Sequence, residues 1–249
     1  MTFSKILATT AVVGMMGSAA FANDINFSQS GGSVGAVTFT QTGTGNMISA
    51  NGTTTAAAAT VTGSLATLKM EQIGSTNKSS FSITPGAGTV EVPALGNVAL
   101  LLKGTDNTSS LTVDQASTGT LDFSFGVEGD DNSVTANITA DNSVVDIESR
   151  GDGFTYTVGQ TAAAADAVNS ITANFVQSGT GAADVDLLQS GATNTITMGA
   201  PSAYGLFAGT GGMTLLGSAT VGITQSSVNA SYTATQTVAP GGTVTIAQN

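Results

Sequence analysis

The stretch Val37-Thr38-Phe39-Thr40-Gln41-Thr42-Gly43-Thr44-Gly45-Asn46-Met47-Ile48 contains the pattern on which the rest of the chain is built. Apolar residues alternate with threonine as far as Gln41, a turn of the form Gln-x-Gly-x-x-Asn follows, and the alternation resumes after Asn46. Alternation with a period of two is typical of β-strands, so the stretch predicts two strands joined by a short arc. The same turn recurs intact at 72–77 and at 189–194.

The segment 1–22 has the character of a secretory signal peptide. Lys5 precedes an apolar run that extends from Ile6 to about Gly17, and Ala20-Phe21-Ala22 supplies the small-x-small pattern of a cleavage site. The run is too short to span a bilayer, although a buried N-terminal helix is an alternative interpretation. We therefore expect cleavage after Ala22 and a folded region that covers 23–249.

Composition and charge narrow the class of protein. Without Lys5 the chain has 4 basic residues against 16 acidic ones, a net charge of −12, which argues against nucleic acid and anionic membranes as partners. Cysteine is absent, which excludes a disulfide framework and a thiolate metal site. No later apolar stretch is long enough for a transmembrane helix, so we expect no membrane insertion. No cofactor is expected either.

A period of about 12 residues runs through the middle of the chain, with the glutamine of the turn as its phase marker. The markers there are Leu102, Gln115, Val127, Ile138, Ser149 and Gln160. Nearer the ends they are Gln29 and Gln41, Gln177 and Gln189, and Gln225, Gln236 and Gln248. The same frame predicts that Thr135 and Thr139 face outward and that eight residues face inward: Val127, Asn132, Val134, Ala136, Ile138, Ser143, Val145 and Ile147.

One strand plus one arc is a unit that predicts an all-β solenoid. Strands of about five residues and arcs of about four do not fit a hairpin meander, which favours two-residue loops. Two units make a coil of about 22 to 24 residues, and stacked coils place like positions about 4.8 Å apart. Inward amides are then satisfied by hydrogen bonds from coil to coil. The glycine of the turn suits an arc that needs a positive φ.

The turn and its flanking alternation resemble the repeat of curlins, the secreted subunits of bacterial curli amyloid fibres. The resemblance covers about half of the chain after position 22. Carried over by position, it implies that the stacking residues of amide ladders are Gln41, Gly43, Asn46, Gln72, Gly74, Asn77, Gln189, Gly191 and Asn194. Partial matches of the turn add Gln177, Asn107 and Asn132.

The resemblance implies a function as well as a fold. We expect a subunit or nucleator of extracellular curli-like amyloid fibres, used for adhesion and biofilm matrix by a Gram-negative bacterium. The expected partners are further copies of the chain, an outer-membrane secretion pore and a nucleator. Two segments, near 51–66 and 199–219, break the frame and are interpreted as insertions, either as loops from one coil or as places where stacking fails.

The acidic residues concentrate between Asp106 and Asp186, where most fall on outward phases. Asp146 and Glu148, for example, alternate with the inward Val145 and Ile147, which predicts a solvated face. Oxygen ligands at 128–132 and at Asp152 suit calcium, yet neither segment matches a calcium-binding nonapeptide repeat, so no metal site is expected. Without histidine, cysteine or a paired arrangement of carboxylates, the sequence does not predict an enzyme.

Two other non-enzymatic functions remain open. A monomeric surface adhesin requires no fibre growth, although no aromatic cluster suited to a sugar is evident. An ice-binding solenoid is suggested by Thr-x-Thr at 38–40, 155–157, 195–197 and 243–245. These pairs are scattered, which is equally typical of ordinary β-propensity.

Overall fold

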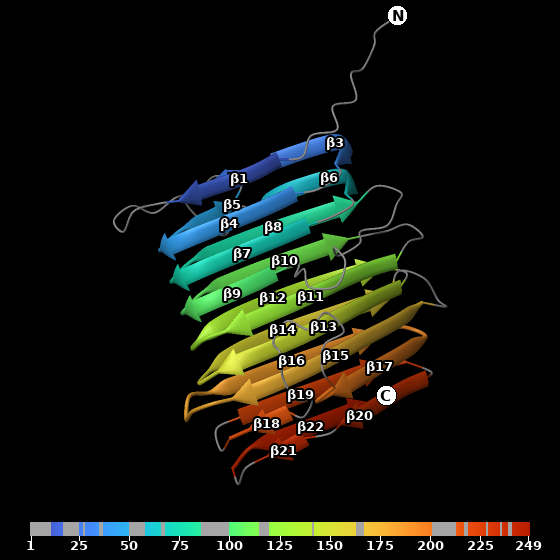
Figure 1. The fold of residues 1–249 in the computed structure, drawn as a ribbon. Helices are drawn as coiled ribbons and strands as arrows, with labels where there is room; N and C mark the ends of the chain where they lie inside the picture. The colour runs from blue at the N-terminus through green and yellow to red at the C-terminus, as the bar shows by residue number, and fades with distance from the viewer. Residues whose placement is uncertain are drawn as a thin grey trace, which may run out of the picture.

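The protein is a β-solenoid whose coils stack along one axis (Figure 1). The strands of successive coils form two sheets, and within each sheet they run parallel to one another. Every regular element that the computed structural model describes is a β-strand, which confirms the predicted fold class. No helix in the described part of the chain is long and apolar enough to cross a membrane. The described residues are 11–16, 25–26, 28–34, 37–49, 58–65, 68–85, 100–114, 120–140, 142–162, 167–200, 213–216, 219–227, 229–234, 236–238 and 241–249.

A coil contributes either one strand to each sheet or, in places, two short strands that share one neighbour. Sheet A consists, in order, of β1 (Ala11–Met16), β4 (Val37–Thr44), β7 (Leu68–Ser75), β9 (Leu100–Thr105), β11 (Thr120–Glu128), β13 (Asn142–Gly151), β15 (Val168–Gln177), β17 (Thr193–Met198) and β20 (Asn229–Ala234), with β18 (Met213–Leu215) and β21 (Gln236–Val238) beside this path. Sheet B consists of β2 (Ile25–Asn26), β5 (Met47–Ser49), β8 (Lys78–Pro85), β10 (Thr108–Asp114), β12 (Asn132–Ala140), β14 (Phe154–Ala162), β16 (Ala183–Ser190), β19 (Ala219–Ser226) and β22 (Thr243–Gln248), with β3 (Ser28–Val34) and β6 (Ala59–Leu65) beside it. Strands β5 and β6, for example, share β8. The first arc leads from sheet A to sheet B, and the second arc leads back.

Coil length varies more than the sequence pattern predicts. Asp152 lies beside Asp130 of the preceding coil at a sequence separation of 22, whereas Gln225 lies on Gln189 at a separation of 36. About 26 residues per coil are typical. The predicted coil length therefore holds for part of the stack only. The strands reach 10 residues in β13 and β15 rather than the shorter length expected, because alternation continues without a break to the edge of each arc.

The core lies between the two sheets. All eight residues predicted to face inward are buried, and Thr135 and Thr139 are half-buried. Aromatic rings pack across the core, with centroids 5.3 Å apart for Phe39 and Phe81 and 5.4 Å apart for Phe154 and Phe175. Full burial of such a side chain is worth about 1.5–3 kcal/mol, so one apolar row per strand stabilises every coil.

Asp146 and Glu148 correct the prediction of a solvated face. Both lie on the outward phase of β13, yet only 4% of Asp146 and 3% of Glu148 is exposed. Their neighbours on the same outer face, Ser124 in β11 and Asn174 in β15, are buried too. Alternation predicts which side chains face away from the core, but it carries no information on whether that outer face meets solvent.

Both predicted insertions partly belong to the stack. Within 51–66, Ala59–Leu65 forms β6, which pairs with β3 and β8. Within 199–219, Met213–Leu215 forms β18, which lies between β15 and β21. The remainder of the two predicted insertions lies mostly outside the described residues. In the expected signal peptide, Ala11–Met16 forms β1, which pairs in parallel with β4.

Candidate functional site: stacked amide ladders

Four asparagines stack at the first arc, one in each of four successive coils. Asn46, Asn77, Asn107 and Asn132 are each at most 1% exposed. The side-chain Nδ2 of each donates to Oδ1 of the next, at 2.7, 3.0 and 3.0 Å along the series. This is the ladder in which like amides satisfy one another inside the fold.

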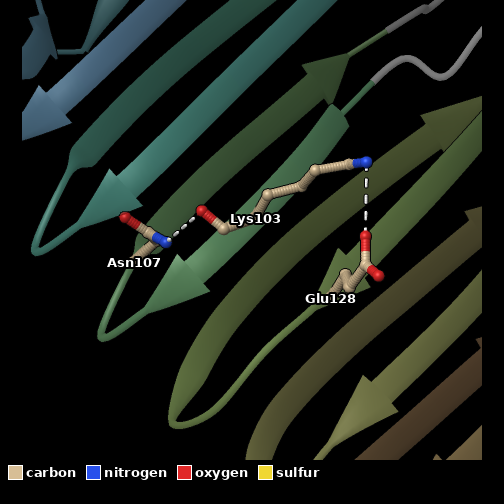
Figure 2. Close-up of polar contacts among 3 residues, drawn as sticks. All are labelled: Lys103, Asn107 and Glu128. Carbon is tan, nitrogen blue, oxygen red and sulfur yellow. Dashed lines mark hydrogen bonds and ion pairs between the residues drawn. The ribbon is translucent and has the colours of Figure 1, made fainter.

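The backbone determines how these amides are oriented. Oδ1 of Asn77 also accepts from the backbone N–H of Asn46 at 3.0 Å, and Nδ2 of Asn77 donates to the carbonyl of Gly43 at 3.2 Å. Asn107 repeats both contacts one coil later and also donates to the carbonyl of Lys103 at 3.3 Å (Figure 2). An amide flipped by half a turn would lose both kinds of bond, so the direction of the ladder is set by the arc.

Glycines line the first arc beside the asparagines. Gly43, Gly74, Gly104 and Gly129 have φ between 113° and 122°, a region that side chains of L-residues rarely adopt. A Cβ on Gly74 would lie 1.9 Å from the carbonyl oxygen of Gly43, and Gly104 has the same relation to Gly74 at 2.0 Å. The arc therefore needs glycine both for its dihedral angles and for the close approach of successive coils.

Sheet A contains a short glutamine ladder. Nε2 of Gln72 donates to Oε1 of Gln41 at 2.9 Å, and both side chains are buried. The next two residues in this register are Leu102 and Val127, so the core continues there with apolar contacts instead of amides.

Sheet B contains a longer glutamine ladder at the opposite end of the molecule. Nε2 of Gln189 donates to Oε1 of Gln160 at 2.6 Å, Gln225 donates to Gln189 at 3.0 Å, and Gln248 donates to Gln225 at 2.8 Å. Backbone carbonyls hold the same nitrogens, as when Gln225 Nε2 donates to the carbonyl of Ser231 at 3.1 Å. The stack therefore presents a glutamine row that reaches its last coil.

The third copy of the turn, at Gln189 to Asn194, lies on the second arc and not on the first. Nδ2 of Asn169 donates to Oδ1 of Asn194 at 3.4 Å, and Ala230 occupies the next place in register. Gly191 has no positive φ, contrary to the prediction for the glycine of the turn. It is required for space instead, because a Cβ there would lie 2.8 Å from Cβ of Ala162.

The two kinds of ladder donate in opposite directions. Along the asparagine ladder each amide donates to the following coil, whereas along both glutamine ladders each amide donates to the preceding coil. Amide dipoles aligned in one column add up along it, so columns of opposite direction offset one another. The asparagine ladder ends at Asn132 in β12, so among the described residues only the sheet B glutamine ladder reaches the last strand, β22.

Gln177 does not join a glutamine ladder. Its neighbour in register on the preceding strand is Gly151, which has no amide side chain. Nε2 of Gln177 donates to the carbonyls of Asp152 and Gly181, and its Oε1 accepts from the N–H of Leu216. Gln177 thus holds arc backbone together, because its place in the arc has no like residue to stack on.

Sequence reasoning missed four rungs of the ladders. Gln160, Gln225 and Gln248 serve only as phase markers in the sequence pattern, yet the structure places them in the sheet B ladder beside Gln189. Asn169 gives no motif, because an alanine-rich segment separates it from Gln160 and hides the turn. The signal that identifies the glutamines is their recurrence once per coil rather than any local motif.

The outer threonines form no flat array. On sheet B the row that contains Thr157 continues with Asp186 and Gly222, and the row that contains Thr155 continues with Asp184. Charged and small residues therefore interrupt the rows on which an ice-binding surface would depend.

Acidic side chains of the arcs contact backbone. Oδ1 of Asp130 accepts from the N–H of Asp152 at 2.8 Å, and Oδ1 of Asp152 accepts from the N–H of Gly181 at 2.6 Å. Lys103 and Glu128 form an exposed ion pair at 3.2 Å between β9 and β11 (Figure 2). In the described part of the chain, no three residues of the types His, Cys, Asp and Glu are grouped so that they could hold a metal ion.

No family model, no curated protein and no solved structure matches this chain.

Proposed function

We propose that the protein is a secreted structural subunit, or the nucleator, of extracellular curli-like amyloid fibres that serve adhesion and biofilm matrix. The observation that carries the proposal is the glutamine ladder of sheet B, which extends to the last coil and leaves Gln248 exposed. A further copy of the chain offers the same amide in the same strand geometry, so it is the partner that continues such a ladder at least cost.

The last strands support this proposal. Within the described residues, β20, β21 and β22 pair on one side only, and 43% of Ile246 in β22 is exposed. Soluble β-proteins protect such edges with charged residues, prolines or bulges. None of these three strands contains a charged residue or a proline, so their edges are open to another strand.

The distribution of charge favours contact at the ends of the stack. No charged side chain follows Asp186, and none lies between Asp24 and Lys69. Apart from Asp24, the acidic residues lie in the middle coils, where they keep parallel stacks apart by like-charge repulsion. Association at the ends and repulsion along the flanks together favour a thin filament over an amorphous aggregate.

The signal peptide motif supports assembly outside the cell. The proposal includes two partners besides further copies of the chain. One is an outer-membrane pore that exports the chain, and the other is a nucleator at the cell surface from which the fibre grows. The asparagine ladder and the glycines of the first arc hold the coils of one copy in register. A folded copy can then serve as the template on which a newly exported copy folds.

Filament growth from the purified secreted chain tests the proposal. At micromolar concentration we expect filaments whose fibre diffraction shows spacings near 4.8 Å and about 10 Å, and whose lag phase is shortened by preformed seeds. A chain that stays monodisperse for weeks, even when seeded, would contradict the proposal and support a monomeric solenoid adhesin.

A further inference from the structure

Strand β4, which becomes the first strand of sheet A once β1 is removed, closely resembles β22, the last strand of sheet B. In β4 the residues are Val37-Thr38-Phe39-Thr40-Gln41, and in β22 they are Val244-Thr245-Ile246-Ala247-Gln248. A second glutamine precedes each pentapeptide, and the interval from Gln29 to Gln41 equals the interval from Gln236 to Gln248. The half-coil from Gln29 to Gln41 thus has the same length and the same end residues as the half-coil from Gln236 to Gln248.

Within each sheet, the early glutamine and the late glutamine occupy the same register position. Gln29 aligns through β6, β8, β10 and β12 with the ladder that ends at Gln248 in sheet B. Gln236 aligns through β18, β15, β13, β11 and β9 with Gln72 and Gln41 in sheet A. The order of sheets is nevertheless reversed: the early pair goes from sheet B to sheet A, and the late pair from sheet A to sheet B.

We propose that a second copy of the chain stacks on β21 and β22 after a half-turn about the solenoid axis, with its Gln29 on Gln236 and its Gln41 on Gln248. This inference rests on the proposed function and on cleavage after Ala22. The half-turn exchanges the positions of sheet A and sheet B, so β3 of the new copy lies against β21, and β4 lies against β22. Like residues then meet, with Phe39 on Ile246 and Val37 on Val244.

Strand direction is compatible with the half-turn. The chain runs outward along one sheet and returns along the other, so the sheets run in opposite directions across the core. A half-turn about the stacking axis reverses the direction of every strand and also exchanges the two sheets. Parallel pairing therefore continues across the junction, and the direction of donation in the glutamine ladder is preserved, from Gln41 to Gln248.

Stacking without a half-turn leaves an empty place. Once β1 is removed, the next strands at that end of the stack are β2 and β3 in sheet B and β4 in sheet A. An unrotated copy would put β3 on β22 and leave one strand width, about 4.8 Å, between β21 and β4. In the uncleaved chain β1 occupies the edge of β4, with Met15 opposite Gln41. The signal peptide strand thus covers the surface that a second copy needs.

Engineered cysteines distinguish the two arrangements, because the chain contains no cysteine of its own. In the half-turned junction Thr40 is opposite Ala247, one residue before the paired glutamines. In the unrotated junction Ser28 is opposite Ala247 instead. Adjacent parallel strands lie about 4.8 Å apart, which is within the Cα separation that a disulfide accepts.

The test compares two double variants of the secreted chain, Thr40→Cys with Ala247→Cys and Ser28→Cys with Ala247→Cys, each assembled into filaments and then oxidised. We expect the first to give a covalent ladder of multimers on a non-reducing gel and the second to remain largely monomeric, as do the single variants. A ladder from the second variant alone, or from neither while wild-type filaments grow, overturns the half-turn and leaves the proposed function intact. If the wild-type chain forms no filaments at all, the proposed function fails, and this inference fails with it.

Discussion

A Cβ atom on Gly74 would lie 1.9 Å from the carbonyl oxygen of Gly43 in the preceding coil. No rotation of a side chain relieves such a contact, because both partners are backbone. The spacing of the coils at the first arc therefore depends on glycine at this place.

Gly74→Ala is expected to destabilise the fold by about 3 kcal/mol or more, because it combines backbone strain with a backbone clash. Gly45→Ala is the matched control, since Gly45 also has a positive φ, of 73°, but a Cβ there would have no atom closer than 4.0 Å. It should cost only about 1–2 kcal/mol. Urea unfolding of both variants measures the difference, and equal losses would show that close approach is unimportant.

Ile138→Asp tests the phase of the core. Ile138 is 2% exposed, so an unpaired carboxylate there is expected to cost several kcal/mol. The adjacent Thr139 is half-buried on the outer side of β12, and Thr139→Asp should change the unfolding free energy by only about 0.5 kcal/mol. Similar effects of the two substitutions on urea unfolding would contradict the assignment of inward and outward faces.

Gln189→Ala interrupts the sheet B ladder between Gln160 and Gln225. It leaves Oε1 of Gln160 without its donor, so we expect about 1–3 kcal/mol of destabilisation and slower seeded filament growth. Asn194→Ala should act in the same direction through the second arc, whereas Thr193→Ala, at a half-buried place, should not. Seeded growth rates compare the three variants, and equal rates for Asn194→Ala and Thr193→Ala would refute the role of the amide.

The burial of the Tyr156 side chain predicts that the protein loses stability at high pH. Burial raises the pKa of Tyr156 far above its ordinary 10.0, and the nearby Ser149 hydroxyl opposes this only in part. Below pH 10 both folded and unfolded states keep the proton; above it the unfolded state ionises first, so the unfolding free energy falls as the pH rises. Tyr156→Phe should remove most of that slope.

The same substitution should also stabilise the protein by about 1 kcal/mol at neutral pH, because the Tyr156 hydroxyl is buried and the nearby Ser149 hydroxyl does not reach it in hydrogen-bond geometry. Tyr232→Phe is the control, since Tyr232 is only half-buried and its removal should abolish less of the slope. Urea unfolding at pH 7 and at pH 11 supplies both readings. An unchanged slope for Tyr156→Phe would exclude this residue as its source.

Removal of the expected signal peptide can be measured directly. The motif that ends at Ala22 predicts that the extracellular protein begins at Asn23. Mass spectrometry of protein collected outside the cell determines the first residue, and an intact N-terminal Met1 on that material would contradict the prediction.

Much of the architecture follows from local pattern. Period-two alternation places Val134, Ala136 and Ile138 in the core, and the structure buries all three. The turn at Gln41 to Asn46 identifies one arc, and its recurrence at Gln72 to Asn77 identifies the next coil. These features can be predicted from the sequence because the inward or outward direction of a side chain depends only on neighbouring residues in a strand.

Other features needed the assembled coils. The turn at Gln189 to Asn194 has the same Gln-x-Gly-x-x-Asn pattern as the turn at Gln41 to Asn46, but it lies on the second arc. Which arc a turn occupies depends on the number of strands wound before it. Several of those strands, such as β6 and β18, lie in segments whose composition conceals them.

The sequence by itself determined that this is a stack of strand and arc units with amides at recurring places, because alternation and turn chemistry are local. Only the tertiary structure decided which amides meet, since Gln160, Gln189, Gln225 and Gln248 are brought together by register between coils of unequal length. It also decided that Asp146 and Glu148 are buried, because cover on the outer face of a sheet depends on contacts that no periodicity records.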